Sequence, residues 1–169
     1  MKKVKLHLGC GEFYKEGYIN IDKYPANLKA VDRAFDCNNP LDYADESVDE
    51  ILAIHLFEHL KRSGLNRTVK SWYRVLKKRG KLILELPNAH IVMNKYLADA
   101  KNERFDEANE FLKWIFGNQE KEGQYHFTAW TPVTLAHFFD KFGFSKVSIG
   151  EGQDDTRPKD LCMRLEATK

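Results

Sequence analysis

The stretches VKLHLGCGE, residues 4–12, and YINID, residues 18–22, indicate how the chain begins to fold. The first alternates polar and apolar side chains, as a half-buried strand does, and then breaks at Gly9 and Gly11. The second is a short apolar run that ends in Asp22. We therefore expect two strands joined through a sharp turn, which glycine accommodates because it has no side chain.

The remaining strands are predicted from apolar runs further along the chain. The runs SVDEILAIH, residues 47–55, and KLILELP, residues 81–87, have apolar centres, which is typical of strands buried in a parallel sheet. Three weaker or terminal runs lie at 31–36, 144–150 and 161–168. The sequence thus predicts seven strands.

A helix is predicted between the fourth and fifth of these strands, because apolar residues recur there at helical spacing. These residues are Leu65, Val69, Trp72 and Leu76. Gly80 is expected to end the helix, since glycine is common just past a helix C-terminus.

A second helix is predicted over residues 131–143. Thr131 suits the N-cap, Pro132 the first helical position and Gly143 the position past the end. Strands that alternate with helices predict an α/β fold, with a mostly parallel sheet and right-handed crossovers.

Residues 88–127 fit no strand and are long for a connection. Their apolar positions predict two helices: Ile91, Val92, Tyr96 and Leu97, then Phe105, Phe111, Leu112, Ile115 and Phe116. Because the segment follows the fifth strand, it should lie at the carboxyl edge of the sheet, where ligands bind. We interpret it as a helical lid, and an extra packed layer is the alternative.

Length and charge limit what the chain can be. The 169 residues suffice for a single domain, 1–169, and 27 Lys and Arg against 25 Asp and Glu give a net charge of +2, which does not favour nucleic acid. No signal peptide or membrane-spanning run is visible, so we expect a cytoplasmic protein without a membrane span. Cys10, Cys37 and Cys162 are expected to be reduced thiols.

The glycine loop and the acid together predict a nucleoside site, because Asp22 at the end of the second strand can accept both hydroxyls of a ribose. A nicotinamide cofactor is disfavoured. Tyr14 stands where a third glycine is expected, and Asp22 follows Gly9 by only 13 residues where about 20 are usual. The site therefore fits a nucleoside without a pyrophosphate.

Five segments together carry a family resemblance. They are LHLGCG, INID, FDCNNPLDYADESVDEILAIHLFEHL, WYRVLKKRGKLILELPN and YHFTAWTPVTLAHFFDKFGF. In order and spacing they resemble the class I S-adenosylmethionine-dependent methyltransferases of the small-molecule type, in particular a short bacterial subgroup. The resemblance covers nearly the whole chain. It implies a Rossmann-like, doubly wound, mostly parallel seven-stranded sheet with an antiparallel last strand. It also implies S-adenosylmethionine as cofactor, with S-adenosylhomocysteine as product.

The resemblance further implies roles for the glycine loop and its acid. Gly9, Cys10 and Gly11 would line the methionine and ribose part of the cofactor, and Asp22 would bind the ribose hydroxyls. The helix that usually follows this loop in the family is much reduced here.

Three more positions match the family pattern. Asp36 corresponds to the acid that faces the adenine amino group, and Cys37 to the residue whose backbone abuts the adenine ring. His55 stands where the fourth strand ends under the cofactor.

The stretch HLFEH, residues 55–59, also matches H-x-x-E-H, a signature of zinc proteases. Such sites hold both histidines on one helix face and need a third protein ligand. Here His55 ends a strand and His59 begins the next turn, so the two rings should not share a face, and we expect no metal. Glu58 and His59 are interpreted as partners for backbone groups at this corner.

Methyl transfer needs alignment of the reactants more than it needs a covalent intermediate. A base is required only when the nucleophile must lose a proton, as a sugar hydroxyl does. His55 and His126 are the candidate catalytic residues, and Tyr125 and His90 are weaker candidates. A purely structural role is the alternative for both histidines.

These observations predict an S-adenosylmethionine-dependent methyltransferase that acts on a small-molecule acceptor, such as a saccharide or a polysaccharide precursor. No nucleic acid partner is expected, and a homodimer is left open. A non-catalytic S-adenosylmethionine-binding module or partner subunit is the alternative, and a zinc hydrolase built on HLFEH is a further one.

Overall fold

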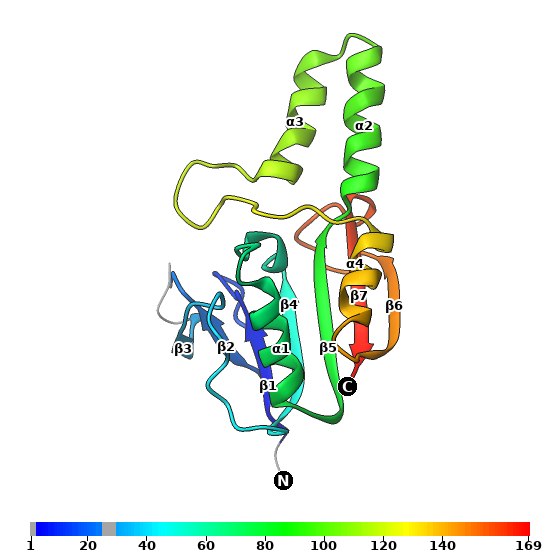
Figure 1. Cartoon of the computed structure of the whole chain (residues 1–169). Helices are drawn as coiled ribbons and strands as arrows, with labels where there is room; N and C mark the ends of the chain where they lie inside the picture. Colours follow the sequence, from blue (N-terminus) through cyan, green and yellow to red (C-terminus); the bar gives the residue numbers. More distant parts are fainter. Residues whose placement is uncertain (1–2, 25–29) are drawn as a thin grey trace.

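A seven-stranded sheet forms the centre of the structure, a computed structural model that describes residues 3–24 and 30–169 (Figure 1). The strands are β1 (Lys5–Leu8), β2 (Ile19–Asp22), β3 (Arg33–Ala34), β4 (Val48–Ile54), β5 (Leu76–Pro87), β6 (Ser145–Glu151) and β7 (Cys162–Thr168). Their order is β3-β2-β1-β4-β5-β7-β6, and only β7 is antiparallel to its neighbours. The predicted Rossmann-like sheet with an antiparallel last strand is confirmed.

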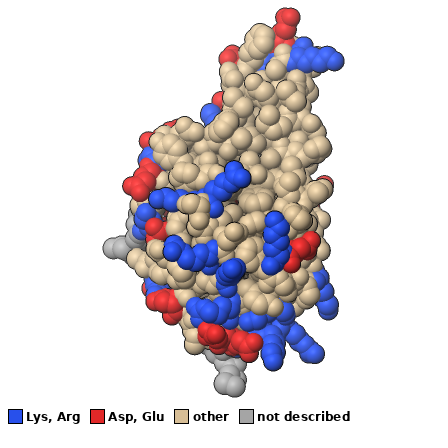
Figure 2. All heavy atoms as spheres, viewed as in Figure 1, with Lys and Arg blue, Asp and Glu red and all other residues tan. Residues whose placement is uncertain are grey.

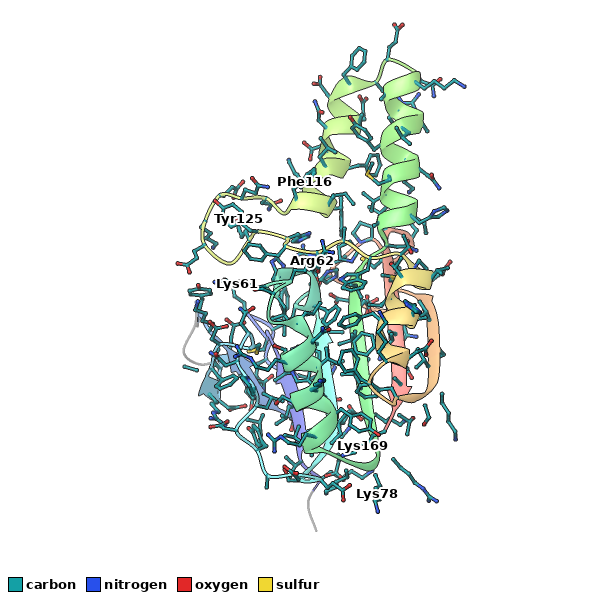
Figure 3. The ribbon with its side chains drawn as sticks, viewed as in Figure 1. Lys61, Arg62, Lys78, Phe116, Tyr125 and Lys169 are labelled. Atoms are coloured by element: carbon teal, nitrogen blue, oxygen red, sulfur yellow. The ribbon has the colours of Figure 1, made fainter. Side chains whose placement is uncertain are left out.

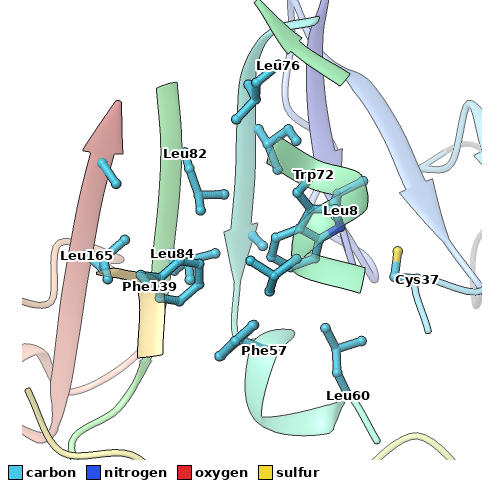
Figure 4. Packing of buried hydrophobic residues seen from close by; sticks show 14 of the residues in the cluster. Leu8, Cys37, Phe57, Leu60, Trp72, Leu76, Leu82, Leu84, Phe139 and Leu165 are labelled. Carbon is cyan, nitrogen blue, oxygen red and sulfur yellow. The ribbon is translucent and has the colours of Figure 1, made fainter. Parts of the chain in front are cut away.

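One face of this sheet packs against the hydrophobic core. Successive side chains of a strand point to opposite faces, so every second residue is directed into the core. Leu6, Ile51, Leu82 and Leu165 lie on the core face, and each is fully buried. Figure 4 shows the side chains of Leu82 and Leu165 on neighbouring strands within this packing. The opposite face includes His7 of β1 and is more polar.

Helices α1 (Leu65–Val75) and α4 (Pro132–Asp140) cover the core face (Figure 1). Trp72 of α1 and Phe139 of α4 are fully buried. Both rings contact Phe57, with centroids 5.9 Å and 5.4 Å from its ring. Phe57 lies in the short 3-10 helix η2 (Phe57–His59), and it therefore joins the two helices beneath the end of β4 (Figure 4).

The start of α4 agrees with the sequence prediction. Thr131 is the N-cap and accepts a hydrogen bond from the backbone of Thr134 at 3.2 Å, and the Thr134 hydroxyl accepts one from the Thr131 backbone at 3.0 Å. Pro132 occupies the first turn, and Gly143 has a φ of 83° beyond the end of the helix. Local capping chemistry therefore sets where this helix begins.

The end of α1 differs from the prediction. The helix stops at Val75 and Leu76 is already extended, so Gly80 does not end it. Gly80 lies inside β5, where the pairing with β4 slips between Leu76 and Lys81. A side chain on Gly80 would come within 2.8 Å of the Lys77 carbonyl oxygen, so glycine is needed for close packing of the backbone in this irregular part of the strand.

The helices predicted after the fifth strand are present as α2 (Ala89–Lys101) and α3 (Phe105–Phe116). Asn88 caps α2 by accepting a hydrogen bond from the backbone of His90 at 3.2 Å. The two helices form a hairpin that projects from the carboxyl edge of the sheet (Figure 1). The segment that crosses this edge is the loop at 117–131, which leads from α3 to α4, and the lid role stays a prediction.

Surface charge and helix length are the two features that bear on binding to nucleic acid and to membranes. In the view of Figure 2, Lys and Arg side chains gather over the lower part of the face, with Asp and Glu beside them mainly along its left and lower rim. Among the described helices, none combines the length and the apolar character that crossing a membrane requires. The cytoplasmic location stays a prediction.

Replacement of Phe57 by alanine is expected to lower the free energy of unfolding by about 3–5 kcal/mol, because it removes the ring that packs against both α1 and α4 and leaves a cavity there. Urea unfolding followed by circular dichroism measures this loss. Phe105→Ala is the matched control, since Phe105 is 63% exposed and its loss should change stability by under about 0.5 kcal/mol. Equal stability of the two variants would contradict the central role of Phe57.

Candidate functional site

The glycine loop turns sharply at the end of β1. Gly9 and Gly11 have φ angles of 66° and 52°, in the left-handed region that favours glycine. The backbone N–H groups of Gly9 and Cys10 both donate to the Ile21 carbonyl of β2, at 2.8 Å and 3.1 Å. A side chain on Gly9 would collide with Leu56 at 2.8 Å, whereas the space above Gly11 is open. The loop therefore offers its backbone at Gly11 to a ligand.

Asp22 lies beside this loop at the end of β2. One carboxylate oxygen accepts a hydrogen bond from the Gly11 backbone at 2.9 Å, and the other accepts one from the Tyr24 backbone at 2.7 Å. Each oxygen retains a further lone pair. The carboxylate is thus held in place by the loop and can still accept hydrogen bonds from a diol.

Asp36 and Cys37 follow β3. Asp36 accepts hydrogen bonds from the backbone and side chain of Asn38 at 3.0 Å and 2.9 Å, and Lys23 Nζ lies 3.2 Å away. Burial alone would raise the pKa of Asp36, but these partners hold that pKa below its ordinary value. Burial raises the pKa of the Cys37 thiol to about 12. The Cys37 side chain belongs to the core, which leaves its backbone for contact with a ligand.

A first cavity of about 700 Å³ borders the glycine loop. It reaches residues 9–11 and His55, and it extends over the polar face of the sheet. It does not include Asp22, Asp36 or Cys37. The glycine loop and His55 therefore border this cavity, whereas the other three residues that the sequence assigned to the cofactor lie outside it.

His55 follows the last residue of β4 and has a φ of 49°, which is uncommon for a residue other than glycine. Its backbone N–H donates to the Glu85 carbonyl of β5 at 2.7 Å. Its ring Nδ1 lies 3.2 Å from a carboxylate oxygen of Glu58. A carboxylate accepts hydrogen bonds, so Nδ1 carries the proton and Nε2 keeps its lone pair.

Nε2 of His55 faces Cys162, whose Sγ lies 3.8 Å away. Burial raises the pKa of the Cys162 thiol to about 12, so this group is neutral at physiological pH. A neutral thiol is a weak hydrogen-bond donor and a poor nucleophile. Cys162 is therefore only a weak hydrogen-bond partner for the basic nitrogen of His55.

Glu58 is an acid with only 2% of its surface exposed. Burial alone would raise the pKa of Glu58, but the hydrogen bond from His55 and the nearby imidazole rings of His59 and His126 hold that pKa below its ordinary value. The sequence interpretation, in which Glu58 and His59 serve backbone groups, fits His59, whose Nδ1 lies 3.0 Å from the Tyr125 carbonyl. The Glu58 side chain bonds to the His55 ring instead.

His126 lies in the loop that crosses the edge of the sheet, and its Nδ1 is 3.1 Å from the Trp114 carbonyl of α3. Burial lowers the pKa of His126, which keeps the ring neutral at physiological pH. The ring stacks edge-on against His59, with centroids 4.5 Å apart. A second cavity of about 360 Å³ contacts His55, Glu58 and His126 together, so the structure brings both candidate catalytic histidines to one place.

The two weaker candidates lie on the surface. The Tyr125 side chain is 41% exposed, and its backbone carbonyl is the group that contacts His59. His90 is exposed on α2, where its ring is 3.1 Å from the Asn94 amide. Figure 3 shows Tyr125 on the crossing loop, near Phe116 at the end of α3 and above Lys61 and Arg62.

Glu85 is a site residue that the sequence reasoning missed. It is fully buried in β5, and its carboxylate accepts backbone hydrogen bonds from Gln153 at 2.9 Å and Asp154 at 2.8 Å. Glu85 thereby anchors the loop between β6 and β7, which borders the first cavity. An acid inside the apolar run LILELP was the available signal, because a buried carboxylate must have partners.

A family model described as a methyltransferase domain matches residues 8–149, which is most of the chain. The chain belongs to this methyltransferase family. No curated protein matches its sequence. The family match supports an enzyme and does not favour the non-catalytic module or the zinc hydrolase.

Solved structures show that the methyltransferase shares its fold with S-adenosylmethionine-dependent enzymes. One from Archaeoglobus fulgidus has a TM-score of 0.68 at 17% identity, with 99% of this chain and 86% of that chain covered. One from Methanosarcina mazei has a TM-score of 0.64 at 20% identity, with 100% of this chain and 93% of that chain covered.

A third similar structure is a phosphoethanolamine N-methyltransferase from Haemonchus contortus, solved with phosphomonomethylethanolamine and S-adenosylhomocysteine. It has a TM-score of 0.59 at 12% identity, with 100% of this chain and 50% of that chain covered. With these matches and the family model, the prediction of a class I S-adenosylmethionine-dependent methyltransferase is confirmed. S-adenosylmethionine is its cofactor.

The residues of this chain fit that cofactor. The space above Gly11 is open, a carboxylate with free lone pairs stands at the end of β2, and the neighbouring cavity has a volume usual for a ligand site. The assignment of Gly9, Cys10, Gly11, Asp22, Asp36, Cys37 and His55 to cofactor binding stays a prediction.

Asp22→Ala is expected to weaken binding of S-adenosylhomocysteine about 10- to 100-fold, because the charged acceptor for the ribose hydroxyls is lost. Isothermal titration calorimetry measures the change. Asp140→Ala, on the exposed end of α4, is the control and should bind as the unchanged protein does. Unaltered affinity of the Asp22 variant would remove Asp22 from the cofactor site.

Proposed function

We propose that this methyltransferase transfers the methyl group of S-adenosylmethionine to a hydroxyl of a small-molecule acceptor, with saccharides as the first class to test. The observation that carries the proposal is the position of His55. It lines the cavity at the glycine loop and also the second cavity under the crossing loop. A base at this position can reach an acceptor in the second cavity while the cofactor occupies the glycine-loop side.

The partners of His55 suit it to the role of a general base. Glu58 fixes the ring orientation and the tautomer, and it stabilises the imidazolium that forms when Nε2 accepts a proton. The uncommon backbone angle of His55 supports the same assignment, since such angles gather at functional sites. A hydroxyl acceptor needs this base, whereas an amine could react without one.

The proposed reaction is a single displacement at the methyl carbon. S-adenosylmethionine supplies an activated methyl group on a sulfonium sulfur. The acceptor oxygen forms a bond to the methyl carbon as the carbon–sulfur bond breaks, and the electron pair of that bond stays on sulfur. The hydroxyl proton passes to Nε2 of His55 and later to solvent.

The second cavity supports a small polar acceptor. At about 360 Å³ it is the smaller of these two cavities, and Asn118, Gln124 and Lys113 are among the residues that border it. Amide and ammonium groups of this kind hydrogen-bond to hydroxylated molecules. The crossing loop supplies two of these side chains, so ordering of this loop over a bound acceptor would exclude water, as a lid does.

The function is tested by incubating the protein with S-adenosylmethionine and a panel of monosaccharides, nucleotide sugars and other small alcohols, with amines for comparison. Mass spectrometry detects a methylated product, and S-adenosylhomocysteine release is measured in parallel. Methylation of a hydroxyl compound is the expected result. Cofactor binding without transfer to any acceptor would favour the non-catalytic alternative.

His55→Gln is expected to lower kcat about 10²- to 10⁴-fold for a hydroxyl acceptor, because the general base is removed. Affinity for S-adenosylhomocysteine should change much less, which separates loss of the base from loss of the cofactor site. His137→Ala, on the exposed side of α4, is the control. An unchanged kcat in the His55 variant would exclude His55 as the base.

A further inference from the structure

Three potential metal ligands meet at the second cavity. Glu58, His59 and His126 each offer a ligand atom, and these atoms lie within 4.8 Å of one another. Glu58 and His59 come from the corner after β4, whereas His126 comes from the crossing loop before α4. The third ligand that the HLFEH stretch lacks is thus supplied by a distant part of the chain.

Hydrogen bonds fix both imidazoles in the form that binds metals. Nδ1 of His59 lies 3.0 Å from the Tyr125 carbonyl, and Nδ1 of His126 lies 3.1 Å from the Trp114 carbonyl. A carbonyl only accepts hydrogen bonds, so both Nδ1 atoms carry the proton and both Nε2 atoms keep their lone pairs. Histidines that ligate metals are held by this kind of hydrogen bond from the opposite ring nitrogen.

Glu58 provides an independent indication of a missing partner. One of its carboxylate oxygens bonds to His55, but the other, Oε2, is buried and has no hydrogen-bond partner among the described residues. Buried carboxylate oxygens are almost always paired, since their desolvation is costly. A cation bound beside His59 and His126 would satisfy this oxygen.

We propose that Glu58, His59 and His126 bind one divalent transition-metal ion, with Zn²⁺ as the expected occupant. Two imidazole nitrogens and one carboxylate form a donor set that Zn²⁺ accepts in sites with an open fourth position. Mg²⁺ and Ca²⁺ prefer oxygen ligands throughout. Bonds of about 2.0–2.1 Å place tetrahedral ligand atoms about 3.3 Å apart, so binding would draw the three side chains together by small rotations.

The surrounding charges permit a cation at this site. Lys113 is paired with Glu110 at 2.7 Å, and Arg157, which also borders the cavity, is exposed to solvent. Glu58 therefore remains the buried anion that faces the metal.

The role of the metal rests on the proposed function. The open fourth position faces the cavity in which an acceptor would bind, and an acceptor hydroxyl that takes this position becomes more acidic. Its proton passes to His55, which shares Glu58 with the metal. The acceptor oxygen then takes the methyl carbon, and the carbon–sulfur electron pair stays on sulfur. The site thus selects acceptors that carry a metal-binding hydroxyl.

Metal binding is tested first without any acceptor. The full-length protein is stripped with a chelator and titrated with Zn²⁺ and, separately, with Mg²⁺. We expect one Zn²⁺ per chain by calorimetry and elemental analysis, and a rise in melting temperature of roughly 5 to 10 °C at a hundredfold excess over the dissociation constant. Absence of stoichiometric Zn²⁺ binding would overturn the proposal.

Two variants locate the metal. His126→Asn places an amide nitrogen near the position of Nδ1, so the hydrogen bond to the Trp114 carbonyl can persist while the ligand atom Nε2 is lost. His59→Asn likewise can keep the hydrogen bond to the Tyr125 carbonyl while it loses Nε2. Each should weaken Zn²⁺ binding at least tenfold. His137→Ala removes an exposed histidine and should bind Zn²⁺ as the unchanged protein does.

Zn²⁺ binding as tight in both Asn variants as in the unchanged protein would place the metal elsewhere and contradict the site. Circular dichroism confirms that the variants fold, and S-adenosylhomocysteine affinity should be unchanged in them. Stoichiometric Zn²⁺ binding without methylation of any hydroxyl compound would refute the proposed function and leave the metal site standing. Hydroxyl methylation by protein that binds no Zn²⁺ would support the proposed function and refute the metal site.

Discussion

Parallel pairing of β1, β4 and β5 is the constraint on which the rest of this methyltransferase depends. Leu8 pairs with Ala53, Ile54 pairs with Glu85, and the next residue, His55, donates its backbone N–H to the Glu85 carbonyl. Because parallel strands end at the same edge, the glycine loop, the HLFEH corner and the start of the helical hairpin are brought together there. Each feature is a local turn, but the pairing makes them one site.

Two buried acids shape this edge, and their surroundings differ. Glu85 accepts backbone hydrogen bonds from the loop between β6 and β7 and pairs with Arg164 at 3.4 Å, so its charge is balanced and it holds that loop. Glu58 has His55 on one oxygen and no described partner on the other. Since the two carboxylates are buried to a similar degree, this difference in hydrogen bonding distinguishes an acid that anchors the fold from one that has room for a cation.

Sequence reasoning succeeded where the determining interaction is local. Thr131 as N-cap and Pro132 predicted the start of α4. Alternation within KLHL predicted β1, and the apolar centre of VDEILAI predicted β4. It failed at Gly80, because the same residue that suits a helix C-terminus also suits the irregular start of a strand, and the choice depends on pairing with β4. The role of Glu85 was missed for a similar reason, since its partners lie in a loop 68 residues later.

The sequence by itself determined the succession of strands and helices along the chain, the glycine loop and the acid at the end of β2. Spacing and turn chemistry act over a few residues, so a sequence shows them directly. It also named His55 and His126. Only the tertiary structure decided that His126 meets Glu58 and His59 beneath the crossing loop, with both rings oriented by backbone carbonyls. Contacts between residues so far apart depend on how the sheet edge and the loop pack, and the periodicity of a single sequence carries no record of that packing.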